Sequence, residues 1–124
     1  AAIGVRAALP DTQIVAVCGD GSFQMSLMEL ATMRQWDLPI KFVIMRNGYL
    51  GLVREYQHHT YHDRYSGVSL DGSPDFEKIA EAYGLDYFHL EHNDEMEERG
   101  DEFLEFDHAA MMVCVVYSFD LVKE

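Results

Sequence analysis

Two apolar runs of this chain each end in a short loop that combines glycine with a polar side chain. The run at residues 14–18 is followed by Gly-Asp-Gly-Ser, and the run at residues 40–45 is followed by Arg-Asn-Gly-Tyr. Each run predicts a buried parallel strand, and the segment between them predicts a crossover helix. Asp20 and Asn47 are therefore expected at the carboxyl ends of two strands of one sheet, which is where open α/β sheets bind ligands.

The two loops together indicate a site for a metal ion and a phosphate. A carboxylate and an amide oxygen are hard ligands that suit octahedral Mg²⁺. Gly19 and Gly21 permit a tight turn and the close approach of a phosphate, which the N–H groups of residues 21–23 are expected to face at a helix start. An Asp in such a turn is commonly a capping residue, but the spacing between Asp20 and Asn47 favours metal ligation.

This succession of motifs resembles the diphosphate anchor of thiamine diphosphate (ThDP) enzymes, in which GDG is followed, after a spacer, by NN. GDG is intact here, and Arg46 replaces the first Asn of NN. The rest of the chain, from residue 1 to about residue 90, is similar to the large subunit of acetolactate (acetohydroxyacid) synthase. The similarity is carried by QMSLMELAT at 24–32, LPIK at 38–41, YLGLVR at 49–54, YHDRYS at 61–66 and PDF at 74–76.

The resemblance implies roles for individual residues. Asp20, Asn47 and the backbone carbonyl of Tyr49 would hold the Mg²⁺ that bridges the two phosphates. Tyr56 stands where such synthases often carry a Trp in the substrate channel. The residues implied to contact ThDP are Gly19, Asp20, Gly21, Ser22, Asn47, Tyr49, Leu50, Gly51, Leu52 and Val53. None of them is implied to be a catalytic acid, base or nucleophile, and helical spacing alone would equally suit core packing of Leu52, Val53 and Tyr56.

The resemblance also implies an activity for the parent enzyme, a transferase of branched-chain amino-acid biosynthesis. That enzyme decarboxylates pyruvate and condenses it with a second 2-oxo acid, and this chain would be its C-terminal ThDP-binding (PP) domain. The implied partners are the N-terminal (PYR) and central domains, further copies in a homo-oligomer, and a regulatory small subunit. Any FAD would be bound outside this chain. The glutamate that activates ThDP and the apolar wedge beneath it also lie elsewhere, so the isolated chain is expected to be inactive.

Two alternatives to this interpretation remain at the level of the sequence. One is another ThDP-dependent enzyme that decarboxylates or ligates 2-oxo acids. The other is a non-catalytic α/β binding domain that kept the fold.

Alternation of strand and helix patterns predicts a doubly wound, three-layer α/β/α fold with a mainly parallel sheet, as a single domain over residues 1–124. The resemblance implies that this is the ThDP-binding fold and that the domain is truncated. Strands are expected at 13–18, 40–45, 87–90 and 109–117, and helices at 1–8, 23–36, 50–56, 74–83 and 93–105. Ser22 and Ser73 are expected to cap helices, and residues 57–73 to form a polar functional loop. The side chains expected against the sheet are Met25, Leu27, Met28, Leu30, Ala31 and Met33.

Charge and cysteine content narrow the classes of partner. A formal net charge of −13 disfavours nucleic acid and anionic membrane, because both need a basic surface. Nine carboxylates lie between Glu91 and Asp107 beside one arginine, which predicts a solvated helix face. No signal peptide or membrane-length apolar run is present. Cys18 and Cys114 fall in strand-like runs and are expected to be reduced core residues of a cytoplasmic protein.

The histidines near residue 60 suggest a metal site that the local pattern does not support. His58 and His62 could share a helical face, with His59 beside them. Structural zinc normally takes four ligands, and a polar loop does not preorganise them. No native metal site is therefore predicted there. Arg64 could anchor a carboxylate or pair with Asp63 or Asp75, and the structural role is favoured.

Overall fold

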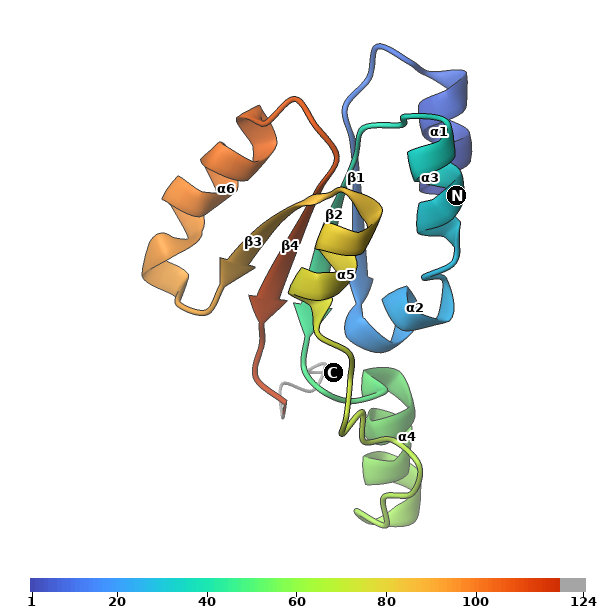
Figure 1. Cartoon of the computed structure of the whole chain (residues 1–124). Helices are drawn as coiled ribbons and strands as arrows, with labels where there is room; N and C mark the ends of the chain where they lie inside the picture. Colours follow the sequence, from blue (N-terminus) through green and yellow to red (C-terminus); the bar gives the residue numbers. More distant parts are fainter. Residues whose placement is uncertain (119–124) are drawn as a thin grey trace.

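Four parallel strands form one sheet in the order β1-β2-β4-β3. They are β1 (Ile14–Gly19), β2 (Ile40–Arg46), β3 (Asp86–Leu90) and β4 (Ala110–Val115). The structure is a computed structural model and describes residues 1–118, so the last residues of the predicted domain, 119–124, lie outside the described part. All strand pairs are parallel, so their carboxyl ends meet at one edge of the sheet, the lower edge in Figure 1. The predicted α/β class is confirmed.

Helices cover the two faces of the sheet unequally. The helices are α1 (Ala2–Ala8), α2 (Asp20–Met25), α3 (Glu29–Gln35), α4 (Gly51–Tyr61), α5 (Phe76–Tyr83) and α6 (Met96–Glu105), with a 3₁₀ turn η1 (Asn93–Glu95) before the last. Side chains of α1, α2, α3 and α5 pack on one face, and α6 packs on the other. Helix α4 lies beyond the carboxyl ends of the strands, away from both faces (Figure 1).

Two apolar cores hold these layers together. The larger core joins α2, α3 and α5 to the sheet and contains Phe23, Leu30, Met33, Ile40, Ile44, Phe76, Ala80, Leu85, Met111 and Val113. The smaller core joins α6 to the sheet and contains Phe88, Phe103, Ala110, Met112 and Cys114. Strand β4 is therefore buried on both faces, which is the reason for its continuous apolar sequence. On β1, Val15 and Val17 face away from the larger core and are exposed.

The single helix predicted at 23–36 is wrong, because the segment forms two short helices. Helix α2 begins at Asp20, directly after the extended Gly19, so Ser22 lies in its first turn and does not cap it. The break at residues 26–28 is stabilised by tight turns, with Ser26 N donating to Phe23 O at 3.0 Å. This break rotates Met25 and Met28 outward, and they are 70% and 73% exposed instead of packed on the sheet. Of the other side chains expected there, Leu30 and Met33 are buried and Ala31 is exposed.

Two boundaries near the predicted loop also differ. Helix α4 continues to Tyr61, into the segment 57–73 that was predicted as loop. Helix α5 is capped by Asp75 instead of Ser73: the Asp75 carboxylate accepts from Glu77 N at 3.1 Å and Lys78 N at 3.3 Å. The pKa of the Asp75 carboxyl is lowered, most of all by the hydrogen bond from the Lys78 side chain and then by the bond from the Lys78 backbone N–H. Gly84 ends α5 with φ +70°, as its position predicts.

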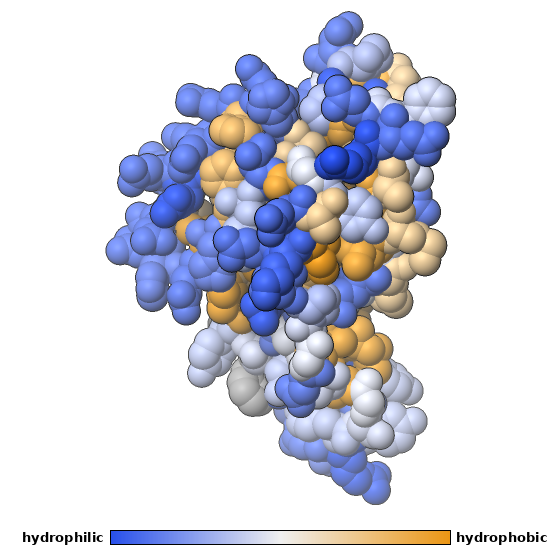
Figure 2. Space-filling view, in the orientation of Figure 1, coloured by the Kyte–Doolittle hydropathy of each residue, from blue (hydrophilic) through white to orange (hydrophobic). Residues whose placement is uncertain are grey.

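The acidic segment before β4 is a solvated helix face, as predicted. In α6 only Phe103 is buried, and the left side of Figure 2, over α6, is hydrophilic. Both cysteines are free thiols: Cys114 is buried and Cys18 is half-buried. Burial raises the pKa of each thiol. Within residues 1–118, none of the helices has the length and apolarity needed to cross a bilayer.

Lys41 attaches α6 to the sheet, and its loss should weaken the fold. Its buried ammonium donates to the carbonyls of Phe103 and Phe106 at the C-terminal end of α6, where a cation is favoured by the helix dipole. Burial lowers the pKa of Lys41, and nearby Asp107 opposes that shift. Replacing Lys41 with Met should lower the free energy of unfolding by about 1 kcal/mol, because the two carbonyls lose their donor.

Urea unfolding of the chain measures this effect. Lys78→Met is the matched control, because the Lys78 side chain is 79% exposed and pairs only at the surface with Asp75. That control should change the unfolding free energy by less than about 0.5 kcal/mol. Equal changes in the two variants would contradict the anchoring role of Lys41.

Candidate functional site

A cavity of about 450 Å³ opens at the carboxyl ends of β1 and β2, between α2 and α4. All the residues that the sequence implied for cofactor contact line it: Gly19, Asp20, Gly21, Ser22, Asn47, Tyr49, Leu50, Gly51, Leu52 and Val53. Met25, Met45 and Val116 line it as well and were not singled out for this site from the sequence. The structure thus brings two loops that are distant in sequence into one concave surface. A larger cavity of about 590 Å³ lies by α1 and shares only Ser22 with this set.

Asp20 connects the two loops. It is 1% exposed, and its Oδ1 accepts from Gly21 N at 3.0 Å while its Oδ2 accepts from Gly48 N at 2.9 Å. The second bond spans the loop after β1 and the loop after β2. Each carboxylate oxygen has a further lone pair, so these bonds leave acceptor capacity for a cation. The Gly21 N–H, expected to face a phosphate, is directed instead at Asp20, which leaves the N–H groups of Ser22 and Phe23 in the first turn of α2.

The loop after β2 forms a tight turn around Asn47. The Asn47 Oδ1 accepts from Tyr49 N at 3.0 Å, and Gly48 between them has φ +74°, a left-handed conformation that favours glycine. Leu50 N donates to Val68 O and Leu70 N donates to Gly48 O, both at 2.9 Å. Among the described residues, no backbone N–H donates to the Tyr49 carbonyl. The turn therefore has a fixed shape and presents a side-chain oxygen and a backbone oxygen that can accept more.

Arg54 and Ser118 stabilise this turn, and neither was selected as a site residue from the sequence. Arg54 is 6% exposed, and its guanidinium carbon lies 4.0 Å from the centre of the Tyr49 ring and 5.1 Å from that of Tyr65. Its Nη1 donates to the Ser118 carbonyl at 2.5 Å, and the Ser118 hydroxyl donates to the Asn47 carbonyl at 2.9 Å. One feature of the sequence could have pointed to Arg54: this cationic residue lies between Tyr49 and Tyr56.

The apolar residues at the start of α4 face outward. Leu52, Val53 and Tyr56 are 81%, 46% and 58% exposed, so the core-packing alternative for them is wrong. Figure 2 shows apolar surface where α4 meets the body of the domain. Tyr56 does not line the cavity; its ring lies edge-to-face on Tyr61, with centroids 5.8 Å apart.

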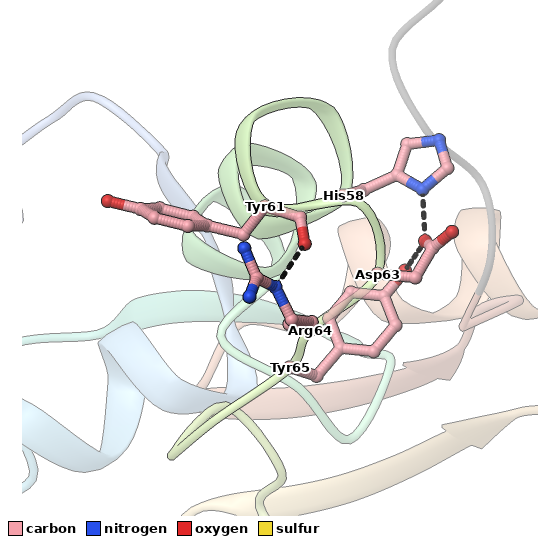
Figure 3. Close-up of polar contacts among 5 residues, drawn as sticks. All are labelled: His58, Tyr61, Asp63, Arg64 and Tyr65. Atoms are coloured by element: carbon pink, nitrogen blue, oxygen red, sulfur yellow. Dashed lines mark hydrogen bonds and ion pairs between the residues drawn. The ribbon is translucent and has the colours of Figure 1, made fainter.

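The last turn of α4 and the residues that follow it form a local hydrogen-bonded turn (Figure 3). His58 Nδ1 lies 2.5 Å from Asp63 Oδ1, to which the Tyr65 hydroxyl donates at 2.7 Å. These bonds, the one to His58 foremost, lower the pKa of Asp63. Arg64 Nε donates to Tyr61 O at 3.1 Å, at the end of α4. Arg64 thus has a structural role, but that bond goes to the helix end and not to an acidic side chain.

The sequence suggested two places for a metal ion, the histidines near residue 60 and the loops of Asp20 and Asn47, and they differ in the ligands that they provide. Within residues 1–118 no three His, Cys, Asp or Glu side chains are grouped to hold a metal ion. Asp20, Asn47 and Tyr49, which line the cavity, have between them one carboxylate, one side-chain amide oxygen and one backbone carbonyl. These are hard oxygen donors, and a Mg²⁺ bound through few protein ligands keeps waters and takes phosphate oxygens for the rest. The donor set therefore fits Mg²⁺ together with a diphosphate.

Comparison with known proteins agrees with this geometry. Residues 1–116 match the family described as thiamine pyrophosphate enzyme, C-terminal TPP binding domain; thiamine pyrophosphate is another name for ThDP. An acetolactate synthase of Arthrospira platensis is 46% identical over 69% of this chain and 15% of its own length. The acetolactate synthase isozyme 3 large subunit of Escherichia coli is 43% identical over 85% of this chain and 18% of its own length.

A third relative covers nearly the whole chain. The acetolactate synthase large subunit of Porphyra purpurea is 38% identical over 94% of this chain and 20% of its own length. The chain thus spans a fifth or less of the length of these relatives, which contain other domains as well.

Proposed function

This chain belongs to the thiamine pyrophosphate enzyme family as a C-terminal TPP binding domain, and from that membership we propose that its 450 Å³ cavity binds Mg²⁺ and the diphosphate of ThDP. The observation that carries the proposal is that Asp20, Asn47 and Tyr49, from two loops distant in sequence, line one cavity. The ligands would be Asp20 through a carboxylate oxygen, Asn47 through Oδ1 and Tyr49 through its carbonyl. Ser22 and Gly51 would lie beside the cofactor, with Leu52 and Val53 on its apolar parts.

The chain's own contribution is to bind and orient the cofactor. When bound, ThDP supplies the electron sink that allows carbon dioxide to leave a 2-oxo acid. Asp20, buried and held by two N–H groups, would neutralise part of the metal charge with little reorganisation. Among the described residues that line the cavity, Asp20 is the only carboxylate and is a proposed metal ligand, so we assign this chain the role of anchoring the cofactor.

We further propose that the parent enzyme is an acetolactate synthase, which decarboxylates pyruvate and condenses it with a second 2-oxo acid. Three relatives named for that activity support this. The other domains of such a subunit, further copies of it, and a regulatory small subunit would be the partners in the cytoplasm, and any FAD would be held outside this chain. Tyr56, exposed on α4, would lie in the substrate channel.

Metal removal tests the cofactor site. Titration calorimetry of the full-length protein that carries this sequence should show ThDP binding with Mg²⁺ present. Treatment with EDTA should weaken that binding at least about tenfold, and added Mg²⁺ should restore it, because Asp20, Asn47 and Tyr49 would hold the diphosphate through the metal. Tight ThDP binding that EDTA does not weaken would contradict the proposed metal site. No binding under either condition would favour the non-catalytic α/β domain.

The isolated chain should not convert pyruvate to acetolactate. Its cavity provides an anchor but no group to activate the cofactor, and the exposed Leu52 and Val53 indicate a surface that another domain would cover. A colorimetric acetolactate assay with saturating ThDP and Mg²⁺ measures this. Turnover by the chain, purified to homogeneity from a host that lacks the enzyme, would contradict the expectation.

A further inference from the structure

The buried guanidinium of Arg54 is the strongest feature that the proposed function leaves unused. Among the described residues only three polar or charged side chains are buried: Asp20, Lys41 and Arg54. Burial of a charged group is costly unless it is well paired and hydrogen-bonded. Lys41 is explained by its bonds to α6, and Asp20 by the two loops that it joins. Arg54 requires an explanation of its own.

Several contacts of Arg54 converge on one turn of the chain, and its guanidinium also lies 5.1 Å from the centre of the Tyr65 ring. Its guanidinium stacks on the ring of Tyr49, whose carbonyl is a proposed metal ligand. Its Nη1 donates to the Ser118 carbonyl, and Ser118 in turn donates to the carbonyl of Asn47, the other ligand of the same turn. Arg54 N also donates to Leu50 O at 2.9 Å, directly after the turn. One side chain thus supports both ligand residues without itself lining the cavity.

We propose that Arg54 is a positioning residue that orders the turn of residues 47–49 for Mg²⁺ before the metal binds. A planar guanidinium can stack on the Tyr49 ring and donate to Ser118 at the same time, which an ammonium cannot do in the same geometry. Without it, the Tyr49 carbonyl and the Asn47 side chain would have to be ordered by the metal itself. This inference rests on the proposed function, because it assumes that these oxygens bind Mg²⁺.

Magnesium affinity tests the inference in the full-length protein that carries this sequence. At saturating ThDP, Arg54→Met should raise the half-saturating Mg²⁺ concentration about tenfold, the usual effect of removing a group that orients a metal ligand. Excess Mg²⁺ should restore ThDP affinity to within about threefold of the wild type, which it could not do for an unfolded site. Arg64→Met is the matched control and should leave the Mg²⁺ dependence unchanged, since Arg64 lies outside the cavity and its Nε donates to Tyr61 O at the end of α4 (Figure 3).

A second variant keeps the test decisive if Arg54→Met does not fold. Ser118→Ala removes only the hydroxyl bond to Asn47 and should raise the half-saturating Mg²⁺ concentration in the same direction. Combined with Arg54→Met, it should add less than its separate effect, because both residues act through one turn. An unchanged Mg²⁺ dependence in Arg54→Met, or in Ser118→Ala where Arg54→Met is unfolded, would overturn the inference. So would an equal effect of Arg64→Met.

Hydrogen exchange separates failure of this inference from failure of the proposed function. In the ligand-free protein, Arg54→Met should speed exchange of the Tyr49 amide, which donates to Asn47 Oδ1, at least about tenfold. If the wild type binds no ThDP with Mg²⁺, the proposed function fails, while the Tyr49 exchange rate still decides whether Arg54 orders the turn. Unchanged exchange at Tyr49 would overturn the positioning role.

Discussion

Replacing Asp20 with Ala should weaken Mg²⁺-dependent ThDP binding at least about 100-fold. This effect is larger than the effect expected for replacing a residue that only orients a metal ligand. The change removes the only carboxylate of the proposed ligand set and, with it, the acceptor for Gly21 N and Gly48 N. The two buried N–H groups then lose their partner, so the unfolding free energy should also fall by about 1–3 kcal/mol. Calorimetry with ThDP and Mg²⁺ measures the first effect, and urea unfolding measures the second.

Asp75 provides a matched control for this experiment. Its carboxylate also accepts from two backbone N–H groups, those of Glu77 and Lys78, but it lies outside the cavity. Asp75→Ala should cost about 1 kcal/mol of stability as a lost helix cap and leave ThDP binding unchanged. ThDP affinity of Asp20→Ala within about threefold of the wild type would contradict metal ligation and leave Asp20 as a purely structural connection between two loops.

Replacing Gly21 with Val should both destabilise the chain and abolish ThDP binding. A Cβ at Gly21 would lie 2.7 Å from Leu50 Cδ2 and 3.2 Å from Leu70 Cδ1. Both atoms are the far ends of leucine side chains, which can rotate away from a single added carbon, but the two methyl groups of Val would force both leucines to move. Overpacking of this kind costs about 1–3 kcal/mol. The displaced Leu50 would also deform the cavity that it lines.

Gly19, on the other side of Asp20, shows that the effect is not general to glycine in this motif. A Cβ at Gly19 would meet no atom within 4 Å. Gly19→Ala should therefore change the unfolding free energy by less than about 0.5 kcal/mol, the usual range for a surface substitution. Thermal or urea unfolding compares the two variants, and equal destabilisation would show that the close approach of Leu50 is not what requires glycine at position 21.

Much of the site could be predicted from short-range pattern. Apolar runs bounded by glycine predict buried strands, and parallel strands bring their carboxyl ends to one edge. That reasoning placed Asp20 beside the loop of Asn47, and the hydrogen bond from Gly48 N to Asp20 Oδ2 is its direct expression. The metal and cofactor roles of these residues stay predictions. The helix stop at Gly84 was also predictable, because only local backbone geometry requires it.

Helix boundaries and exposure were harder to predict, because they depend on which partner competes for each group. The helix predicted at 23–36 breaks at residues 26–28, and Met25 and Met28 are exposed as a result, although their spacing suits burial. Ser73 has a capping sequence but bonds to Leu70 O and Gln24, so Asp75 caps α5 instead. Periodicity reports which residues share a face and does not report whether another element covers that face.

The strands, the parallel α/β class and the two loops that meet at the site could be predicted from the sequence, because each depends on contacts within or next to one element. How the loop of Asn47 is held in place depends instead on the packing of distant elements. Its support comes from Ser118, 71 residues further along the chain, and from a guanidinium buried between Tyr49 and Tyr65. Such contacts leave no periodic trace in the sequence, since they arise only when separate elements have packed.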